Sequence, residues 1–242
     1  MKRLGLHGLS AAGALALGSL VTLAIAQSNI DNTVPDKYAW AENVGWTNWF
    51  DAGSGAQGVN VGSKVLAGYI WGENIGWINV GDGTPGGTNG QYVNATGSDF
   101  GINVNADGTL HGYAWGENVG WINFDGGAAA SPAQPARILC SAPPSQPLAR
   151  LTGFAWGENI GWLNLSVATA GQYVAVNSAT TPITCDLNHD GLKNGRDIQT
   201  FANLLLGGGA NWRDICSGDL SGNGTLDMSD VSPFVTCLLT AP

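Results

Sequence analysis

Aromatic, polar and apolar positions follow the same short pattern four times along the chain. Each copy has an aromatic residue, a Trp, the run x-Glu-Asn-x-Gly, a second Trp, and a tail in which apolar residues flank an Asn. Thr47 takes the first apolar position of the tail in the first copy. Because self-similarity at this spacing is typical of repeat architectures, the pattern predicts four similar structural units. The copies begin at Tyr38, Tyr69, Tyr113 and Phe154.

Each copy predicts a β-hairpin. Five residues separate the paired Trp residues, for example Trp40 and Trp46, and the Asn and Gly of that run tolerate the positive φ angles of tight turns. In this register the two rings lie opposite each other, and such a cross-strand pair contributes roughly 0.2–1 kcal/mol. We therefore expect the Trp residues to belong to the core. We expect each turn glutamate to accept hydrogen bonds from turn amides; these are Glu42, Glu73, Glu117 and Glu158.

A third strand is expected after each hairpin, so residues 27–182 are predicted to form an all-β repeat domain. One unit is too small to bury its own apolar face, so the units must pack on one another. A sandwich, a small propeller or a solenoid-like stack would each satisfy this requirement. The proline-rich segment 131–150 predicts an insertion loop around one short strand. The third strands are expected at Gly58, Gly101, Ala136 and Tyr173.

Residues 1–26 are typical of an export signal. Lys2 and Arg3 precede a largely apolar run, and Ala24-Ile25-Ala26 matches the small-x-small cleavage pattern. The alternative is an uncleaved membrane anchor, although the run is interrupted by Gly and short for a span. The sequence thus predicts a secreted protein, at a bacterial cell surface, that begins near Gln27.

The charge balance and the cysteines agree with export. Removing Lys2 and Arg3 with the signal would lower the formal charge from −9 to −11. This acidic balance argues against nucleic acid as a partner, because nucleic-acid-binding faces are basic. An even number of cysteines in an exported chain predicts disulfides. Of the three connectivities that four cysteines allow, we favour Cys140–Cys185 with Cys216–Cys237.

Two twelve-residue acidic segments follow the repeats, Asp186–Asp197 and Asp219–Asp230. Both have oxygen-bearing side chains at positions 1, 3, 5, 9 and 12 and Gly at position 6. This spacing suits calcium, which takes 6–8 oxygen ligands around a sharp turn. The expected ligands of the first loop are Asp186, Asn188, Asp190, Asp197, Asn194 through water, and the carbonyl of Leu192. Those of the second are Asp219, Ser221, Asn223, Asp227, Asp230 and the carbonyl of Thr225.

An apolar helical pattern follows each loop, at about 195–206 and 230–239. Position 12 is Asp in both loops, where an EF-hand has Glu, and no helix-sized segment precedes the first loop. These differences point away from a calmodulin-like pair. The two loops, each feeding one helix at the end of an exported chain, resemble a type I dockerin over roughly residues 183–240. We therefore place a small all-α, calcium-loop domain at 183–242.

The dockerin resemblance implies two bound Ca²⁺ ions and a cohesin-like partner on a scaffold or cell surface. In that family, loop positions 10 and 11 help to select the cohesin. The implied contact residues, with the helical Gln199 added, are Gly195, Arg196, Gln199, Met228 and Ser229. Positions 10 and 11 are Gly195 and Arg196 in the first loop and Met228 and Ser229 in the second. The two pairs differ from each other, and neither matches the Ser/Thr pairs of clostridial dockerins. The Trp repeats resemble the GYAW-x-x-N-x-GW repeats of bacterial surface proteins.

The sequence offers no catalytic constellation, because its acids repeat in turns and no Ser-His-Asp or Cys-His set is evident. We expect a secreted, non-catalytic modular protein that docks to a cohesin-type partner in a polysaccharide-related assembly. One alternative is a carbohydrate-binding module carried by a dockerin. Another is a self-associating surface or filament subunit that uses open β edges. Exposed aromatics that could bind sugar are Trp49, Tyr92 and Tyr173.

Overall fold

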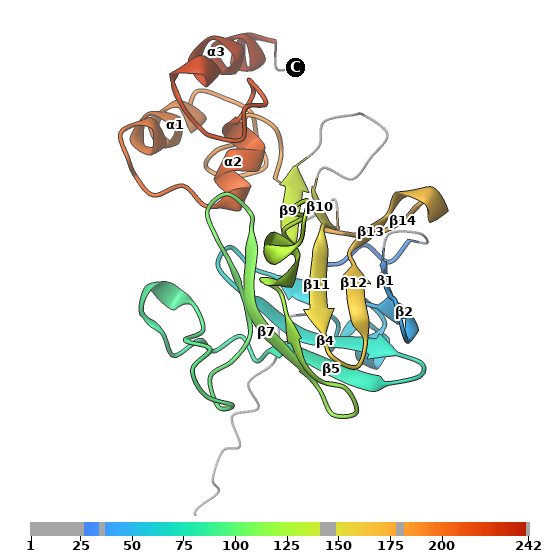
Figure 1. Cartoon of the computed structure of the whole chain (residues 1–242). Helices are drawn as coiled ribbons and strands as arrows, with labels where there is room; N and C mark the ends of the chain where they lie inside the picture. The colour runs from blue at the N-terminus through green and yellow to red at the C-terminus, as the bar shows by residue number, and fades with distance from the viewer. Residues whose placement is uncertain (1–26, 34–36, 141–148, 178–181, 241–242) are drawn as a thin grey trace, which may run out of the picture.

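The computed structural model describes residues 27–33, 37–140, 149–177 and 182–240. The predicted signal lies outside these residues. Four hairpins pair side by side and close into an eight-stranded antiparallel barrel (Figure 1). The hairpin strands are β1 Tyr38–Ala41, β2 Gly45–Asn48, β4 Leu66–Gly72, β5 Gly76–Gly81, β7 Leu110–Gly116, β8 Gly120–Asn123, β11 Phe154–Gly157 and β12 Gly161–Asn164.

All four predicted hairpins are confirmed, and in each the two Trp residues pair directly, as Trp40 does with Trp46. The joins between hairpins also repeat one register. The first Trp of a hairpin pairs with the tail Asn of its neighbour, as Trp71 does with Asn48. The remaining joins are Trp115 with Asn79, Trp156 with Asn123, and Trp40 with Asn164.

The closed barrel replaces the sandwich, propeller or solenoid that we expected. Pairing of β1 with β12 joins the first hairpin to the last, so the sheet path returns to its start. Closure removes the free edges that an open stack of hairpins would expose. Each of the eight hairpin strands is therefore paired on both sides.

The expectation that the hairpin Trp residues form the core is wrong. Side chains alternate between the two faces of a strand, so the residues between the aromatic positions point inward. Ala39, Ile70, Ala114 and Ala155 are fully buried, whereas Trp40 is 39% exposed on the outer wall. A barrel of this size holds small and branched side chains inside but has no room for eight indoles.

The apolar residue of each turn helps to close one end of the barrel. Ile75, Val119 and Ile160 are buried members of the barrel core, and Val44 packs against it. The strand residue that faces such a side chain is Gly in three hairpins. A Cβ at Gly72 would lie only 2.6 Å from the Ile75 side chain. The Gly that follows the first Trp of the motif is therefore explained by packing at this end of the barrel.

The predicted third strands are confirmed in place. They are β3 Asn60–Val61, β6 Ile102–Val104, β9 Arg137–Cys140 and β14 Gln172–Ala175. Strands β3 and β6 pair with β4 and β7, whereas β9 and β14 join β10 Ala149–Thr152 and β13 Ser166–Val167 in a four-stranded sheet. Short 3₁₀ turns complete the loops: η1 Ala52–Gly55, η2 Thr88–Gly90, η3 Gly126–Ala129, η4 Ala168–Ala170 and η5 Met228–Asp230.

Three helices form the C-terminal region, which lies at the barrel end away from the β4–β5 and β7–β8 turns (Figure 1). Helices α1 Asp197–Leu205 and α3 Val231–Leu239 confirm the two predicted helices. Helix α2 Trp212–Gly218 was not predicted, because seven residues are too few for a helical period to be evident. It begins with a capping box between Asn211 and Asp214.

Helix α2 fastens the C-terminal region to the barrel. Trp212 is 1% exposed and belongs to the barrel core, and its indole nitrogen donates a 2.8 Å hydrogen bond to the Gly62 carbonyl. A disulfide joins Cys140 to Cys216, and a second joins Cys185 to Cys237.

The pairing that we favoured is therefore wrong, because α2 carries Cys216 back to β9. Two disulfides are typical of proteins in oxidising, extracytoplasmic compartments. Within the ranges that the structure describes, every helix is too short or too polar to cross a membrane.

Candidate functional site

Each hairpin carries a cluster of three aromatic rings on the outer wall of the barrel. The two Trp rings of a hairpin are edge-to-face, with centroids 4.6–5.0 Å apart. The leading aromatic ring meets the second Trp at 6.0–6.4 Å. Such pairs contribute about 0.5–1.5 kcal/mol beyond area burial. The clusters are Tyr38–Trp40–Trp46, Tyr69–Trp71–Trp77, Tyr113–Trp115–Trp121 and Phe154–Trp156–Trp162.

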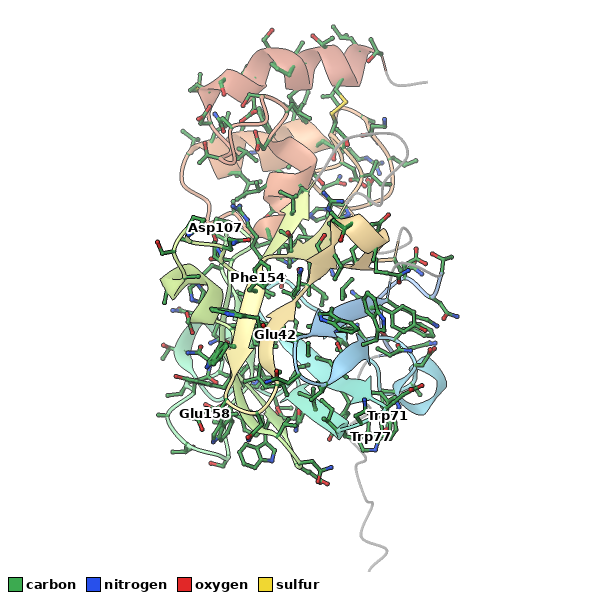
Figure 2. All side chains as sticks on the ribbon, turned by 45° about the vertical axis from the view of Figure 1, so that its right-hand side comes forward. Glu42, Trp71, Trp77, Asp107, Phe154 and Glu158 are labelled. Carbon is green, nitrogen blue, oxygen red and sulfur yellow. A yellow bond between two sulfur atoms is a disulfide. The ribbon has the colours of Figure 1, made fainter. Side chains whose placement is uncertain are left out.

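A groove of about 480 Å³ lies where the fourth hairpin meets the first. Phe154, Trp162 and Asn164 line one side of this groove. Trp40 and Glu42 line the other. Figure 2 shows Phe154 and Glu42 beside the junction of these two hairpins. We call this hollow the first groove.

A second groove of about 600 Å³ lies where the first hairpin meets the second. Its walls come from the same repeat positions: Tyr38, Trp46 and Asn48 on one side, Trp71 and Glu73 on the other. Trp40 lines both grooves, so they adjoin across the first hairpin. Among the described residues, neither groove is lined by a Lys or an Arg.

The turn glutamates do not make the bonds that we expected. Glu42 accepts a hydrogen bond at 3.4 Å from the Trp162 amide, which belongs to the neighbouring hairpin and not to its own turn. Within the described part of the chain, Glu73, Glu117 and Glu158 form no hydrogen bond and no ion pair. The carboxylates therefore project beside the aromatic clusters, and their repetition is not explained by turn geometry.

Asparagines, and not the turn glutamates, make the repeated hydrogen bonds of the turns and tails. The side-chain amides of the turn residues Asn74, Asn118 and Asn159 each donate a 3.0 Å hydrogen bond to a backbone carbonyl in the turn of the preceding hairpin. The tail asparagines accept from the amide two residues ahead, as Asn164 does from Ser166 at 3.0 Å. The recurrence of both asparagines in all four copies was the signal for these roles.

Two of the three candidate sugar-binding aromatics are buried. Trp49 is 0% exposed because it follows Asn48 and so points into the barrel, where its indole nitrogen donates to the Thr47 hydroxyl at 3.3 Å. Thr47 and Trp49 both differ from the residues at these positions in the other copies. The two changes belong together, because the Thr47 hydroxyl accepts the hydrogen bond of the buried Trp49 indole. Tyr173 is half-buried, with the Arg150 guanidinium 5.6 Å from its ring centre.

Tyr92 is also inside the fold, at 4% exposed. Its hydroxyl accepts from the Gly83 amide at 2.6 Å and donates to the Leu66 carbonyl at 3.3 Å. Burial raises the pKa of Tyr92 to about 12. Trp49 and Tyr92 therefore belong to the core and offer no face to a ligand.

The two acidic loops repeat one hydrogen-bond network. The Asp at position 12 accepts from the amides of positions 2, 3 and 9 in both loops, at 2.8–3.2 Å. The Asp at position 1 accepts from the amides of positions 5 and 6, at 2.7–3.2 Å. The Gly at position 6 has a positive φ in each loop, 86° at Gly191 and 87° at Gly224. Two segments with different residues therefore adopt the same conformation.

The predicted oxygen ligands lie in these loops with little positive charge near them. Asp186, Asp197 and Asp230 are at most 2% exposed. Among the described residues, the ion pair that reaches a predicted ligand is that of the exposed Arg196, whose Nη1 lies 4.0 Å from Asp190 Oδ2. Hydrogen bonds from the Ser229 hydroxyl and amide lower the pKa of Asp227 to about 2. Among the residues that the structure places, no three His, Cys, Asp or Glu side chains form a group that could hold a metal ion.

The residues implied as partner contacts lie around α1 and the start of α3. Arg196 and Met228 are strongly exposed, and Gly195 is exposed beside them. Gln199 donates to Asn203 at 2.9 Å along α1. The Ser229 hydroxyl donates to Asp227 at 2.6 Å, which ties it to the second loop.

The two helices meet through stacked Phe rings. The centroids of Phe201 and Phe234 are 4.0 Å apart, at an interplanar angle of 18°. Each Phe follows position 12 of its loop by four residues. The two loop–helix halves therefore meet through equivalent residues.

One polar array was missed by the sequence analysis. His111 Nδ1 lies 2.5 Å from Asp125 Oδ1, and His111 Nε2 lies 3.2 Å from the Thr109 hydroxyl. That hydroxyl donates to Asp107 at 2.7 Å, so its proton is directed at a carboxylate and not at the imidazole. Asp125 also accepts from the Gly112 amide at 3.0 Å. We interpret the array as a bridge between β7 and the segment after β8.

Comparisons of the chain with protein-family models, with curated proteins and with solved structures found no match.

Proposed function

We propose that this is an exported, non-catalytic modular protein whose C-terminal region binds two Ca²⁺ ions and docks to a cohesin-like partner on a scaffold or cell surface. The observation that carries the proposal is the duplicated loop network. Position 12 receives the same three amides in each loop, although eight of the twelve residues differ between Asp186–Asp197 and Asp219–Asp230.

The donor set of each loop fits calcium in its chemistry. Every predicted ligand offers oxygen, and hard divalent cations prefer carboxylate, amide and carbonyl oxygens. A loop contributes three aspartates, and its other expected ligands are amide, hydroxyl and backbone oxygens. Buried carboxylates without a nearby cation are costly, so Asp186, Asp197 and Asp230 favour an ion beside them.

A bound ion would supply charge neutralisation and would fix the start of each helix. The chain's own residues then set the docking face. Apolar side chains are exposed on both helices, Ile198 by 53% and Val235 by 49%, and the polar Arg196 and Ser229 lie just before α1 and α3 in the chain. Large exposed apolar side chains rimmed by polar groups are typical of protein-binding surfaces. Loops held rigid by metal lower the ordering cost of binding.

Capture from the envelope fraction of the secreting cell tests the docking proposal. The mature chain is immobilised and washed in Ca²⁺ or in chelator. We expect a cohesin-like protein to be retained only in Ca²⁺. Arg196→Glu with Met228→Asp should weaken retention at least about tenfold. Lys193→Glu, in the first loop but outside the implied contact set, is the matched control and should leave retention unchanged. Retention that is equal in Ca²⁺ and chelator would contradict the proposal.

A further inference from the structure

We propose that the first and second grooves together bind a neutral polysaccharide of hexopyranose units, with Trp40 as the wall that they share. This site lies on the barrel and is separate from the docking function of the C-terminal region.

The aromatic walls suit the flat faces of sugar rings. A hexopyranose presents C–H groups on its faces and hydroxyls around its edge, so it stacks on an aromatic ring while its edge reaches polar groups. Trp40 and Trp46 are 39% and 40% exposed, so each keeps part of its ring open after packing on the other. Ligand sites combine such aromatic walls with a few placed polar groups.

The polar groups of the grooves can bond hydroxyls. Glu73 accepts no hydrogen bond from any described residue, so both of its oxygens are available to sugar hydroxyls. Asn164 lines the first groove, and its side-chain oxygen accepts from the Ser166 amide, so the group that it can offer a sugar hydroxyl is its side-chain nitrogen, a donor. Hydrogen bonds from hydroxyls to a carboxylate are stronger than bonds between neutral groups.

Charge selects a neutral ligand. Glu42 and Glu73 line the grooves, and no Lys or Arg in the described part of the chain does. The whole chain carries a formal charge of −9. A uronate or a sulfated sugar would meet these carboxylates without a counter-charge, and like charges at close range repel. Neutral hydroxyl-rich chains avoid this cost.

Size and continuity favour a chain over a single sugar. The volumes of about 480 and 600 Å³ both lie within the range of about 300–1,000 Å³ that is typical of ligand sites. Because Trp40 lines both grooves, a ligand in one can continue into the other across the first hairpin. An extended chain therefore fits the surface better than an isolated ring.

The third hairpin offers a comparison, because a ring from outside the motif packs against its aromatic cluster. Phe100 packs edge-to-face on Trp121 at 5.1 Å. The η3 turn, which follows the third hairpin, lies against the fourth. A Cβ at Gly126, the first residue of η3, would come within 2.7 Å of Trp156 Cβ. Trp115 keeps the same motif position as Trp40 and similar exposure, yet lines neither groove. It provides a matched control.

Native gel electrophoresis of the full mature chain tests the proposal. The gels contain hydroxyethylcellulose, barley β-glucan or galactomannan as neutral probes, and carboxymethylcellulose as an anionic one. We expect at least one neutral probe to retard the protein, with and without chelator. Trp40→Ala should weaken retardation at least about tenfold, whereas Trp115→Ala should change it less than about twofold. Should Trp40→Ala fail to fold, Glu73→Gln is compared with Glu117→Gln, and only the former should weaken retardation.

Three results would overturn the proposal. The first is that no neutral probe retards the chain. The second is that only carboxymethylcellulose does so. The third is that the members of each matched pair lose retardation equally, which would indicate a general effect on the barrel. Retardation is expected both with and without chelator, so it does not depend on bound calcium. A failure of sugar binding therefore leaves calcium-dependent docking untouched, and the reverse also holds.

Discussion

Trp40 of the first hairpin pairs with Asn164 of the last, and this pairing closes the barrel. The same register joins each of the other hairpins to its neighbour. The repeat therefore encodes both the hairpin and its join. Because the paired residues share the outer face of the wall, every motif Trp and every tail Asn is placed outside.

Burial should separate Trp49 from Trp115, in the opposite sense to what the sequence predicted. Trp49→Ala removes a fully buried ring from the barrel interior and should cost about 3–5 kcal/mol of unfolding free energy. Trp115→Ala removes a ring that is 37% exposed and packs on Trp121, so it should cost about 1–2 kcal/mol. Urea denaturation of the two variants measures the difference. A larger loss for Trp115→Ala would contradict the placement of the motif Trp residues on the outer wall.

The contact between α2 and the barrel should couple the two parts of the chain. Trp212→Ala leaves a cavity in the barrel core and deprives the Gly62 carbonyl of its donor, so it should cost about 3–5 kcal/mol. Trp212→Phe fills most of the space and should cost less. Thermal melts should show the barrel transition lowered in both variants, more so with Ala. An unchanged barrel transition in Trp212→Ala would mean that α2 does not pack on the barrel.

Local features of the fold were predictable from the sequence. The hairpins follow from paired Trp residues around an Asn–Gly turn, and the loops follow from the spacing of oxygen-bearing residues around Gly191 and Gly224. Both signals lie within about a dozen residues, where backbone preference and side-chain chemistry act together. Helices α1 and α3 were found for the same reason.

Long-range features were not predictable in this way. Closure of the barrel depends on β1 meeting β12, which no local pattern specifies. Strand alternation places the motif Trp residues on one face of the sheet and Ala39, with the matching residues of the other hairpins, on the opposite face. It does not determine which of the two faces points into the barrel. The small residues at the inward positions were the available signal, because a narrow barrel needs them. The burial of Trp212 and the Cys140–Cys216 bridge likewise arise only once the barrel exists.

Calorimetric titration of Ca²⁺ into the mature chain, freed of metal by chelator, tests the central claim most directly. The account predicts binding of two equivalents, with a rise in helical circular dichroism as paired aspartates are neutralised. Asp197→Asn should remove the first equivalent and Asp230→Asn the second, while Asp107→Asn, an acid outside the loops, should keep both. Absence of binding, together with a helical signal that chelator does not change, would contradict the account.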